Sequence, residues 1–156
     1  MDLQDDATIF GLSLALLAVA YAIGRVVGPK VTKCETDDQR RKQRAWILTL
    51  ISSVVCGAHG VFFLGRVIKY GFGHEFSRGE TVADRRVALF FLAYCIADLA
   101  TGALDYIDEI DYQSGWAHHS FYGIGLCVLL YRKHTHFFMA GLIEELPTVL
   151  LAWARL

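Results

Sequence analysis

The chain has 156 residues, a net charge of −1, and a composition that is 54% hydrophobic, with a mean hydropathy of +0.38. Its apolar residues form blocks that approach the ~20 residues needed to cross the ~30 Å core of a bilayer, rather than the stripes of a soluble helix. The sequence therefore predicts one all-α, polytopic membrane domain. The absence of a basic, aromatic-rich cluster excludes a nucleic-acid-binding protein.

Five membrane-spanning helices are predicted, at about residues 9–28, 46–67, 87–104, 115–131 and 137–156. We expect the first to be a retained helix and not a signal peptide, because acidic residues (Asp2, Asp5 and Asp6) precede it and it lacks a basic n-region. Pro147 lies inside the fifth span. Since proline removes one helical N–H, we expect it to kink that helix.

The distribution of charge predicts the orientation. The first loop is strongly basic, and basic residues in short loops resist translocation. We therefore expect this loop to be cytosolic, the amino terminus to lie on the opposite side, and the carboxyl end to lie on the same side as the loop. The loop residues concerned are Lys30, Lys33, Arg40, Arg41, Lys42 and Arg44.

The cysteines indicate neither a disulfide framework nor a zinc site, because no CxxC pair occurs. Cys34 lies in the basic loop. Cys56, Cys95 and Cys127 lie inside predicted spans, where we expect them to pack between helices as small apolar side chains.

Ionisable groups within the last three spans are the main functional signal: Asp98, the pair His118-His119 and the pair Glu144-Glu145. A carboxylate near the middle of a helix opposes insertion by ~2.5 to 3.5 kcal/mol, so it needs a partner, a proton or water. We expect these groups to avoid lipid and to converge on one polar chamber. Adjacent residues point ~100° apart on a helix, so one glutamate would line the chamber while the other pairs with a neighbouring helix.

Each of these features also has a structural interpretation. Asp98 and the two glutamates would then be interhelical hydrogen-bond partners, and the histidines would be interfacial residues. A histidine is, however, the natural proton carrier near neutral pH, and a doubled histidine suits a general base with a helper.

Three other polar groups have simpler interpretations. His59, among small residues of the second span, is expected to have its hydrogen bonds satisfied within the bundle. His134 and His136 are expected in a solvated turn, and no metal site is assigned. The acidic run is expected to be a solvated turn, because it lacks the glycine turn of a calcium loop. That run comprises Asp105, Asp108, Glu109 and Asp111.

Several short motifs occur in a fixed order along the chain. They are Arg41-Lys42-Gln43-Arg44-Ala45-Trp46 with Ser52-Ser53, Tyr94 and Asp98 as Tyr-x-x-x-Asp, Asp111 ahead of Trp116-Ala117-His118-His119, and Glu145-Leu146-Pro147-Thr148 followed by Arg155. This series resembles the TLC domain, a superfamily that includes the ceramide synthases, the translocation-associated membrane protein and smaller TLC-domain proteins. Residues 41–156 would form the TLC-like domain, and residues 1–40 would hold the first span and the basic loop.

The resemblance implies a helical bundle around a chamber for a long-chain lipid. Carried over residue by residue, His118 and His119 would be the base and acyl-handling pair, Asp98 an interior acid and Glu145 the carboxylate of the last helix. The chamber lining would also include Glu144, Thr148, Tyr94 and Trp116. No cofactor is implied, and acyl-CoA would be a substrate if the protein were an acyltransferase.

One departure bears on activity. Ceramide synthases carry a His-Asp-x-x-Asp segment, whereas this chain reads His136-Phe137-Phe138-Met139-Ala140, without either aspartate. The chain is also expected to be truncated relative to the family after its fifth helix. We therefore expect a multi-pass membrane protein that binds, senses or modifies membrane lipids. The alternatives are an accessory subunit of a larger membrane complex and an acyl-CoA-dependent N-acyltransferase acting on a sphingoid amine. The family alone suggests the endoplasmic reticulum.

Overall fold

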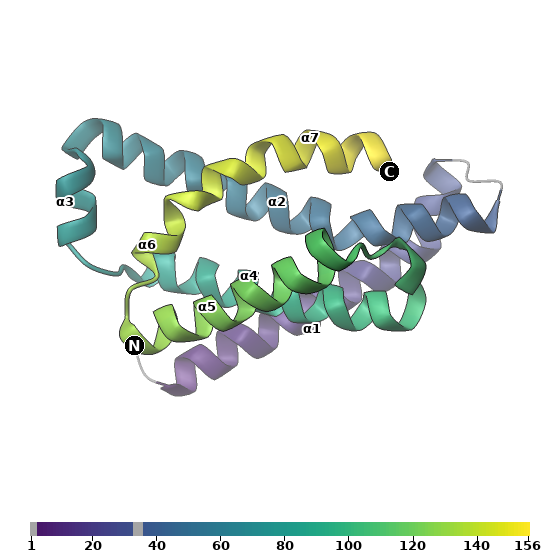
Figure 1. The fold of residues 1–156 in the computed structure, drawn as a ribbon, viewed down its shortest axis with the longest axis horizontal. Helices are drawn as coiled ribbons and strands as arrows, with labels where there is room; N and C mark the ends of the chain where they lie inside the picture. Colours follow the sequence, from purple (N-terminus) through teal and green to yellow (C-terminus); the bar gives the residue numbers. More distant parts are fainter. Residues whose placement is uncertain (1–2, 33–35) are drawn as a thin grey trace.

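The computed structural model describes residues 3–32 and 36–156, and every regular element within them is helical. Five passes run antiparallel along one long axis (Figure 1). They are α1 (Leu3–Val31), α2 (Asp37–Tyr70), α4 (Val82–Asp105), α5 (His118–Arg132) and a broken pass made of α6 (His136–Met139), η3 (Gly141–Glu144) and α7 (Glu145–Arg155). The connections contain α3 (Phe72–Ser77), the 3-10 turn η1 (Ile107–Glu109) and the π-helical segment η2 (Tyr112–Ala117).

Four passes are long and apolar enough to cross a membrane: α1, α2, α4 and the segment His136–Arg155. This confirms the predicted all-α, membrane-embedded class. The fourth predicted span, residues 115–131, corresponds to α5, which has 15 residues. At ~1.5 Å per residue, α5 alone is roughly 22 Å long, so it falls short of the hydrocarbon core.

The helices of the first two predicted spans extend beyond the apolar blocks. Helix α2 begins at Asp37, well before the predicted start at Trp46. Thr36 caps it: the Thr36 hydroxyl accepts a hydrogen bond from the Gln39 N–H, and the Gln39 side chain accepts one from the Thr36 N–H. Such a capping box stabilises a helix start within polar sequence, where hydropathy gives no signal.

The last pass is broken rather than simply kinked. It changes from α-helix to the 3-10 turn η3 just before Glu145, so Pro147 falls in the first turn of α7, where its missing N–H costs little. Here the chain passes very close to α2. A Cβ atom built on Gly60 would lie 2.7 Å from the carbonyl carbon of Leu142 and 2.8 Å from the nitrogen of Ile143. Only glycine permits this approach without displacing backbone.

Helices α2 and α4 form the centre of the bundle. They pack against each other and against α1, while α5 packs on α4 and α7 packs on α2 (Figure 1). Fully buried side chains at these contacts include Leu48, Cys56, Ala88, Ala93 and Cys95. Because α7 packs mainly on α2 rather than on α1 or α5, space remains on both sides of α2.

One end of the bundle, the basic-loop end, joins the start of α2 to the end of α4. Arg44 lies 3.1 Å from Asp105, and Arg41 donates a hydrogen bond of 3.1 Å to Glu109. The expectation of a solvated acidic turn was therefore wrong for Asp105 and Glu109, whose side chains are only 18% and 19% exposed.

The carboxyl end lies at this same end of the bundle, as predicted. The Gln43 amide donates a hydrogen bond of 3.2 Å to the backbone carbonyl of Leu156. The acidic segment that joins α4 to α5 contains no basic residue. Its carboxylates Asp105 and Glu109 pair instead with Arg44 and Arg41, which belong to the basic segment that was predicted to be cytosolic.

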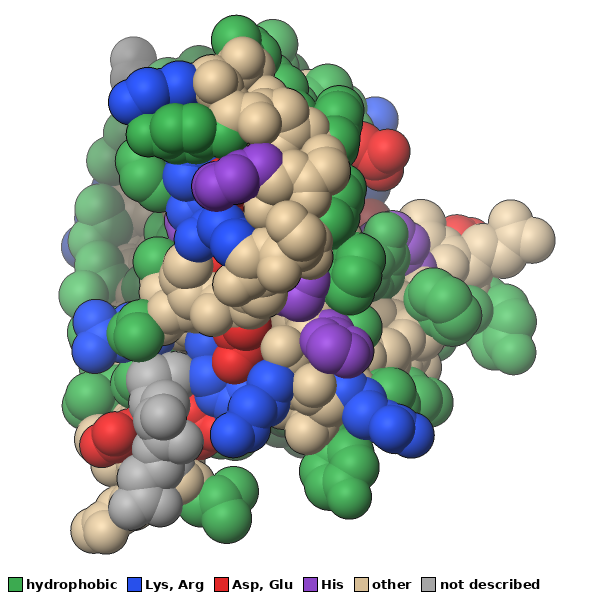
Figure 2. All heavy atoms as spheres, turned by 90° about the vertical axis from the view of Figure 1, so that its left-hand side faces the viewer, with side chains coloured by type: hydrophobic (Ala, Val, Ile, Leu, Met, Phe, Trp, Pro, Cys, Tyr) green, Lys and Arg blue, Asp and Glu red, His purple; other side chains and the backbone are tan. Residues whose placement is uncertain are grey.

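The opposite end, the α3 end, holds a buried network of ion pairs. Asp84 is fully buried and lies within 3.2–3.3 Å of His59, Arg66 and Arg78. The prediction that His59 is satisfied between helices is thereby confirmed. Viewed from this end, the molecule shows Lys and Arg side chains gathered around carboxylates, with histidines nearby (Figure 2).

Arg85 is the centre of a second part of this network. Its Nε donates hydrogen bonds of 2.9 and 3.0 Å to the two carboxylate oxygens of Asp6, and its Nη2 also donates to Asp6. Its Nη1 donates to Glu80 at 3.1 Å and to the Leu130 carbonyl at 2.9 Å. Glu80 in turn accepts a hydrogen bond from the Thr135 hydroxyl. One guanidinium therefore ties together α1, α4 and the end of α5.

The structure also tests the sequence expectations for the remaining histidines and the cysteines. His134 is exposed as expected, but His136 is 2% exposed and packs against Phe137 and Phe76, so its predicted solvation was wrong. Cys56 and Cys95 are buried free thiols, as expected, but Cys127 is exposed, so the prediction that it packs between helices was wrong. The expectations for Asp2, Lys33 and Cys34 fall outside the described residues.

Candidate functional site

A cavity of about 320 Å³ lies near the basic-loop end, between α2, α4, α5 and α7. We call it the polar chamber. Most of the residues predicted for the site line it. These are Tyr94, Asp98, His118, His119, Glu145 and Thr148.

Asp98 and His119 form the centre of the chamber. The Asp98 Oδ2 lies 3.1 Å from the His119 Nδ1, and the Tyr106 hydroxyl donates a hydrogen bond of 2.8 Å to the Asp98 Oδ1. The Asp98–His119 contact is close but not aligned, because Nδ1 has no hydrogen-bond partner in the described part of the chain. Both residues are buried. A small rotation of the imidazole would complete the bond, and such tightening is typical of sites that await a ligand.

Aromatic rings hold the two histidines in place. The ring of His119 meets that of Tyr94 edge-on at 5.2 Å, and the ring of His118 meets that of Tyr122 at 4.6 Å. The Tyr94 hydroxyl lies 3.2 Å from the Thr49 hydroxyl. His119 is therefore fixed on the acid side of the chamber, while His118 remains exposed at its edge.

The two glutamates differ, as the helical geometry predicts. Glu145 is half-buried and faces the chamber, with Thr148 one turn further along α7. Glu144 is exposed, lies outside the chamber lining and has no hydrogen-bond or ion-pair partner in residues 3–32 and 36–156. The expectation that the second glutamate pairs with a neighbouring helix was wrong. Trp116 is likewise absent from the lining.

The π-helical segment η2 leads directly into the histidine pair. Asp111 begins it by accepting hydrogen bonds from the backbone N–H groups of Gln113 and Ser114, at 2.9 and 2.8 Å. The hydrogen bonds from the Ser114 backbone and hydroxyl, the largest influences, lower the pKa of Asp111, so it is a carboxylate at neutral pH. A π-turn next to candidate catalytic residues is a recurrent feature of functional sites.

The chamber is acidic. Its lining includes the carboxylates of Asp98, Glu109, Asp111 and Glu145 but no lysine or arginine. Glu109 and Asp111 mark its opening at the basic-loop end, and Asp98 and Glu145 lie deeper. The chamber thus joins an aqueous rim to an acid–base centre inside the bundle.

Sequence reasoning missed two residues of this centre. Tyr106 is 1% exposed and bonds Asp98, although it lies in a run of acidic residues that was assigned to a turn. Thr49 contacts Tyr94 from α2. An aromatic residue two turns after a membrane aspartate was the available signal for Tyr106.

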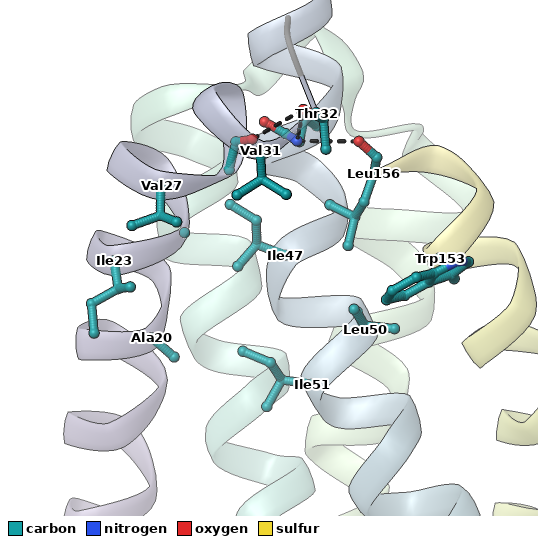
Figure 3. A pocket seen from close by; sticks show the side chains of 13 residues that line it. Ala20, Ile23, Val27, Val31, Thr32, Ile47, Leu50, Ile51, Trp153 and Leu156 are labelled. Carbon is teal, nitrogen blue, oxygen red and sulfur yellow. Dashed lines mark hydrogen bonds between the residues drawn. The ribbon is translucent and has the colours of Figure 1, made fainter.

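A second, apolar groove of about 700 Å³ lies on the other side of α2, between α1 and α7. Figure 3 shows Ile23 and Val27 of α1 on one side, Trp153 of α7 on the other and Ile47 and Ile51 of α2 between them. Its polar end is the Gln43 amide, which donates hydrogen bonds to the Thr32 hydroxyl and the Leu156 carbonyl. We call it the apolar groove.

Comparison with known proteins adds no relative: no family model, curated protein or solved structure matches the chain. The described residues also contain no group of three or more histidine, cysteine, aspartate or glutamate side chains arranged to hold a metal ion. The functional inference therefore depends on the chemistry of the polar chamber.

Proposed function

We propose that the protein binds a membrane lipid by its polar headgroup in the polar chamber, in the manner of a TLC-type membrane protein. The observation that supports this most is the contact of 3.1 Å between Asp98 and His119 inside a cavity that also contains Glu145. Buried acids in a membrane domain are costly unless they serve a partner or a ligand. The unaligned Nδ1 of His119 indicates that its present partner satisfies it incompletely.

The shape of the chamber is compatible with a lipid. Helices α5 and α7 pack on different central helices, so the chamber lies between two passes that do not close on each other. The outward face of α5 is apolar, with Phe121 75% and Ile124 70% exposed. A headgroup held at Asp98 and His119 would leave its hydrocarbon chains beside this apolar face.

The same geometry suits acyl transfer to an amine. In that reaction the amine nitrogen forms a bond to the thioester carbonyl carbon, His119 accepts the amine proton, the C–S bond breaks, and the departing thiolate takes that proton. Asp98 would stabilise the protonated imidazole. The specific observation that favours this second candidate is the series of contacts from the Tyr106 hydroxyl to the Asp98 carboxylate and from that carboxylate to the His119 imidazole.

The test is native mass spectrometry of the gently solubilised protein with its co-purified lipids. We expect the wild type to carry a stoichiometric lipid and the His118→Ala/His119→Ala variant to retain about tenfold less of it. If the wild type modifies the lipid chemically, the variant should carry the unmodified lipid. His134→Ala is the matched control, because it removes an exposed histidine outside the chamber.

Two further readouts make the result decisive. Thermal unfolding must show that the double variant is folded, and added acyl-CoA with a long-chain amine tests for turnover. A folded double variant that retains the lipid as well as the wild type would contradict lipid binding in the chamber. A stable multisubunit assembly without bound lipid, indifferent to the histidines, would instead identify an accessory subunit.

A further inference from the structure

A third cavity, of about 620 Å³, lies at the basic-loop end between α1 and α2. Its lining consists of four basic residues, Arg25, Lys30, Arg40 and Arg44, together with Ala22, Val26 and Pro29. No carboxylate of residues 3–32 and 36–156 is part of this lining. The residues of α1 that face it lie on the side of the helix opposite to the apolar groove, as the 100° helical increment requires. We call it the basic pocket.

Two of its arginines are held in place by one acid. The Asp105 Oδ2 lies 3.2 Å from the Arg25 Nε and 3.1 Å from the Arg44 Nε, and it also accepts a hydrogen bond of 2.6 Å from the Tyr21 hydroxyl. The terminal nitrogens of both guanidinium groups have no hydrogen-bond partner in the described parts of the chain. Asp105 therefore orients both guanidinium groups through their Nε atoms. Their terminal N–H groups remain available to bind a phosphate.

The charge of the pocket is not balanced by carboxylates of the described residues. Two carboxylates, Asp105 and Asp37, lie within ion-pair distance of its four cations, and Asp37 is an exposed partner of Arg40. Lys30 has no hydrogen-bond or ion-pair partner in residues 3–32 and 36–156. Among the described residues, the pocket therefore has four cations and two paired carboxylates, which leaves two positive charges uncompensated.

The spread of these cations along α1 matches the thickness of a lipid headgroup layer. Arg25 lies five residues before Lys30 on α1, so the two are separated by roughly 7 to 8 Å along the helix axis. The polar layer on each side of a bilayer has a thickness of roughly 5 to 8 Å. Apolar Ala22 lies about one helical turn deeper than Arg25, on the side where hydrocarbon would lie.

We propose that the basic pocket binds the phosphate monoester headgroup of an anionic membrane phospholipid, as a site separate from the polar chamber. Basic pockets between membrane helices recognise such headgroups by charge and by hydrogen bonds to the phosphate oxygens. Arg25 and Arg44 supply donors oriented by Asp105, and Lys30 and Arg40 supply exposed ones. A zwitterionic lipid has no net charge to balance the two cations.

The experiment measures binding of phosphatidic acid, phosphatidylcholine and inorganic phosphate to the detergent-solubilised full chain by native mass spectrometry. The variant Lys30→Gln/Arg40→Gln removes two exposed cations of the pocket. The matched control Arg86→Gln/Arg132→Gln removes two exposed cations at the α3 end. We expect the pocket variant to bind phosphatidic acid at least about tenfold more weakly, and the control to bind it as the wild type does.

The remaining outcomes separate the alternatives. Equal loss in both variants, or equal affinity for phosphatidylcholine, would overturn the proposal, because either result indicates non-specific attraction. Competition by inorganic phosphate as effective as that by phosphatidic acid would overturn the lipid as the source of the phosphate. Unchanged binding of phosphatidic acid to the folded His118→Ala/His119→Ala variant would support a site independent of the chamber.

Discussion

Replacement of Arg85 by methionine is expected to lower the free energy of unfolding by ~3 to 5 kcal/mol, the largest effect that we anticipate for a single substitution. The change leaves Asp6 and Glu80 without their cation in side-chain environments that are only 12% and 11% exposed. It also leaves the Leu130 carbonyl without its side-chain donor. The loss of stability arises because two largely buried carboxylates remain without a cation, rather than because the attraction of the ion pairs is lost.

A second substitution tests that reason. In Arg85→Met/Asp6→Asn one stranded charge is removed, so part of the lost stability should return, whereas Arg86→Met, at the exposed neighbouring position, should change stability by less than about 0.5 kcal/mol. The measurement is reversible unfolding in mixed micelles, followed by tryptophan fluorescence. If Arg85→Met and Arg86→Met have equal effects, the network around Arg85 does not stabilise the bundle.

Replacement of Gly60 by valine is expected to cost ~1 to 3 kcal/mol and to displace α7 from α2. Any side chain at this position meets the backbone of Leu142 and Ile143 at 2.7–2.8 Å, and backbone in a packed turn cannot move as a side chain does. Glu145 begins α7 immediately after this turn. The lipid that we propose for the polar chamber should therefore be retained less well by this variant, which should also be less stable.

Gly65→Ala is the matched control, because it lies on the same helix with no atom within 4 Å of its added Cβ. Alanine favours helix by ~0.8 to 1.0 kcal/mol over glycine, so this variant should be as stable as the wild type or slightly more stable. Unfolding in micelles and lipid retention by native mass spectrometry provide the two readouts. A Gly60→Val protein with normal stability and normal lipid content would show that α7 does not approach α2 this closely.

The apolar blocks were sufficient to predict the bundle, because hydrophobic length determines which segments cross a bilayer. The sequence was also sufficient to predict that Asp98, His118, His119 and Glu145 lie close together, because ionisable residues within membrane spans almost always face the interior of the bundle. The position of each residue along its helix predicted how deep in the membrane that residue lies. These predictions depend on single residues and on the rise of a helix, both of which the sequence contains.

Features that depend on tertiary contacts were not predictable in the same way. Hydropathy does not reveal that Asp105 and Glu109 lie beside Arg44 and Arg41, because these partners are separated by more than sixty positions in the chain. The burial of His136 depends on Phe76 in the same manner. The break before Pro147 also escaped prediction, because proline indicates a disruption without saying on which side the helix ends.

The π-helical segment η2 has a consequence for how this chain tolerates insertions and deletions. A π-turn contains about one residue more than an α-turn, so the segment sets the rotational phase at which α5 begins. Removing one residue between Tyr112 and Ala117 would rotate α5 by ~100° and carry His119 away from Asp98, although every side chain of the chamber would still be encoded. The number of residues in this connection therefore matters to the chamber as much as the identity of the histidines does. A related protein with all the chamber residues but a connection of different length would not have the same site.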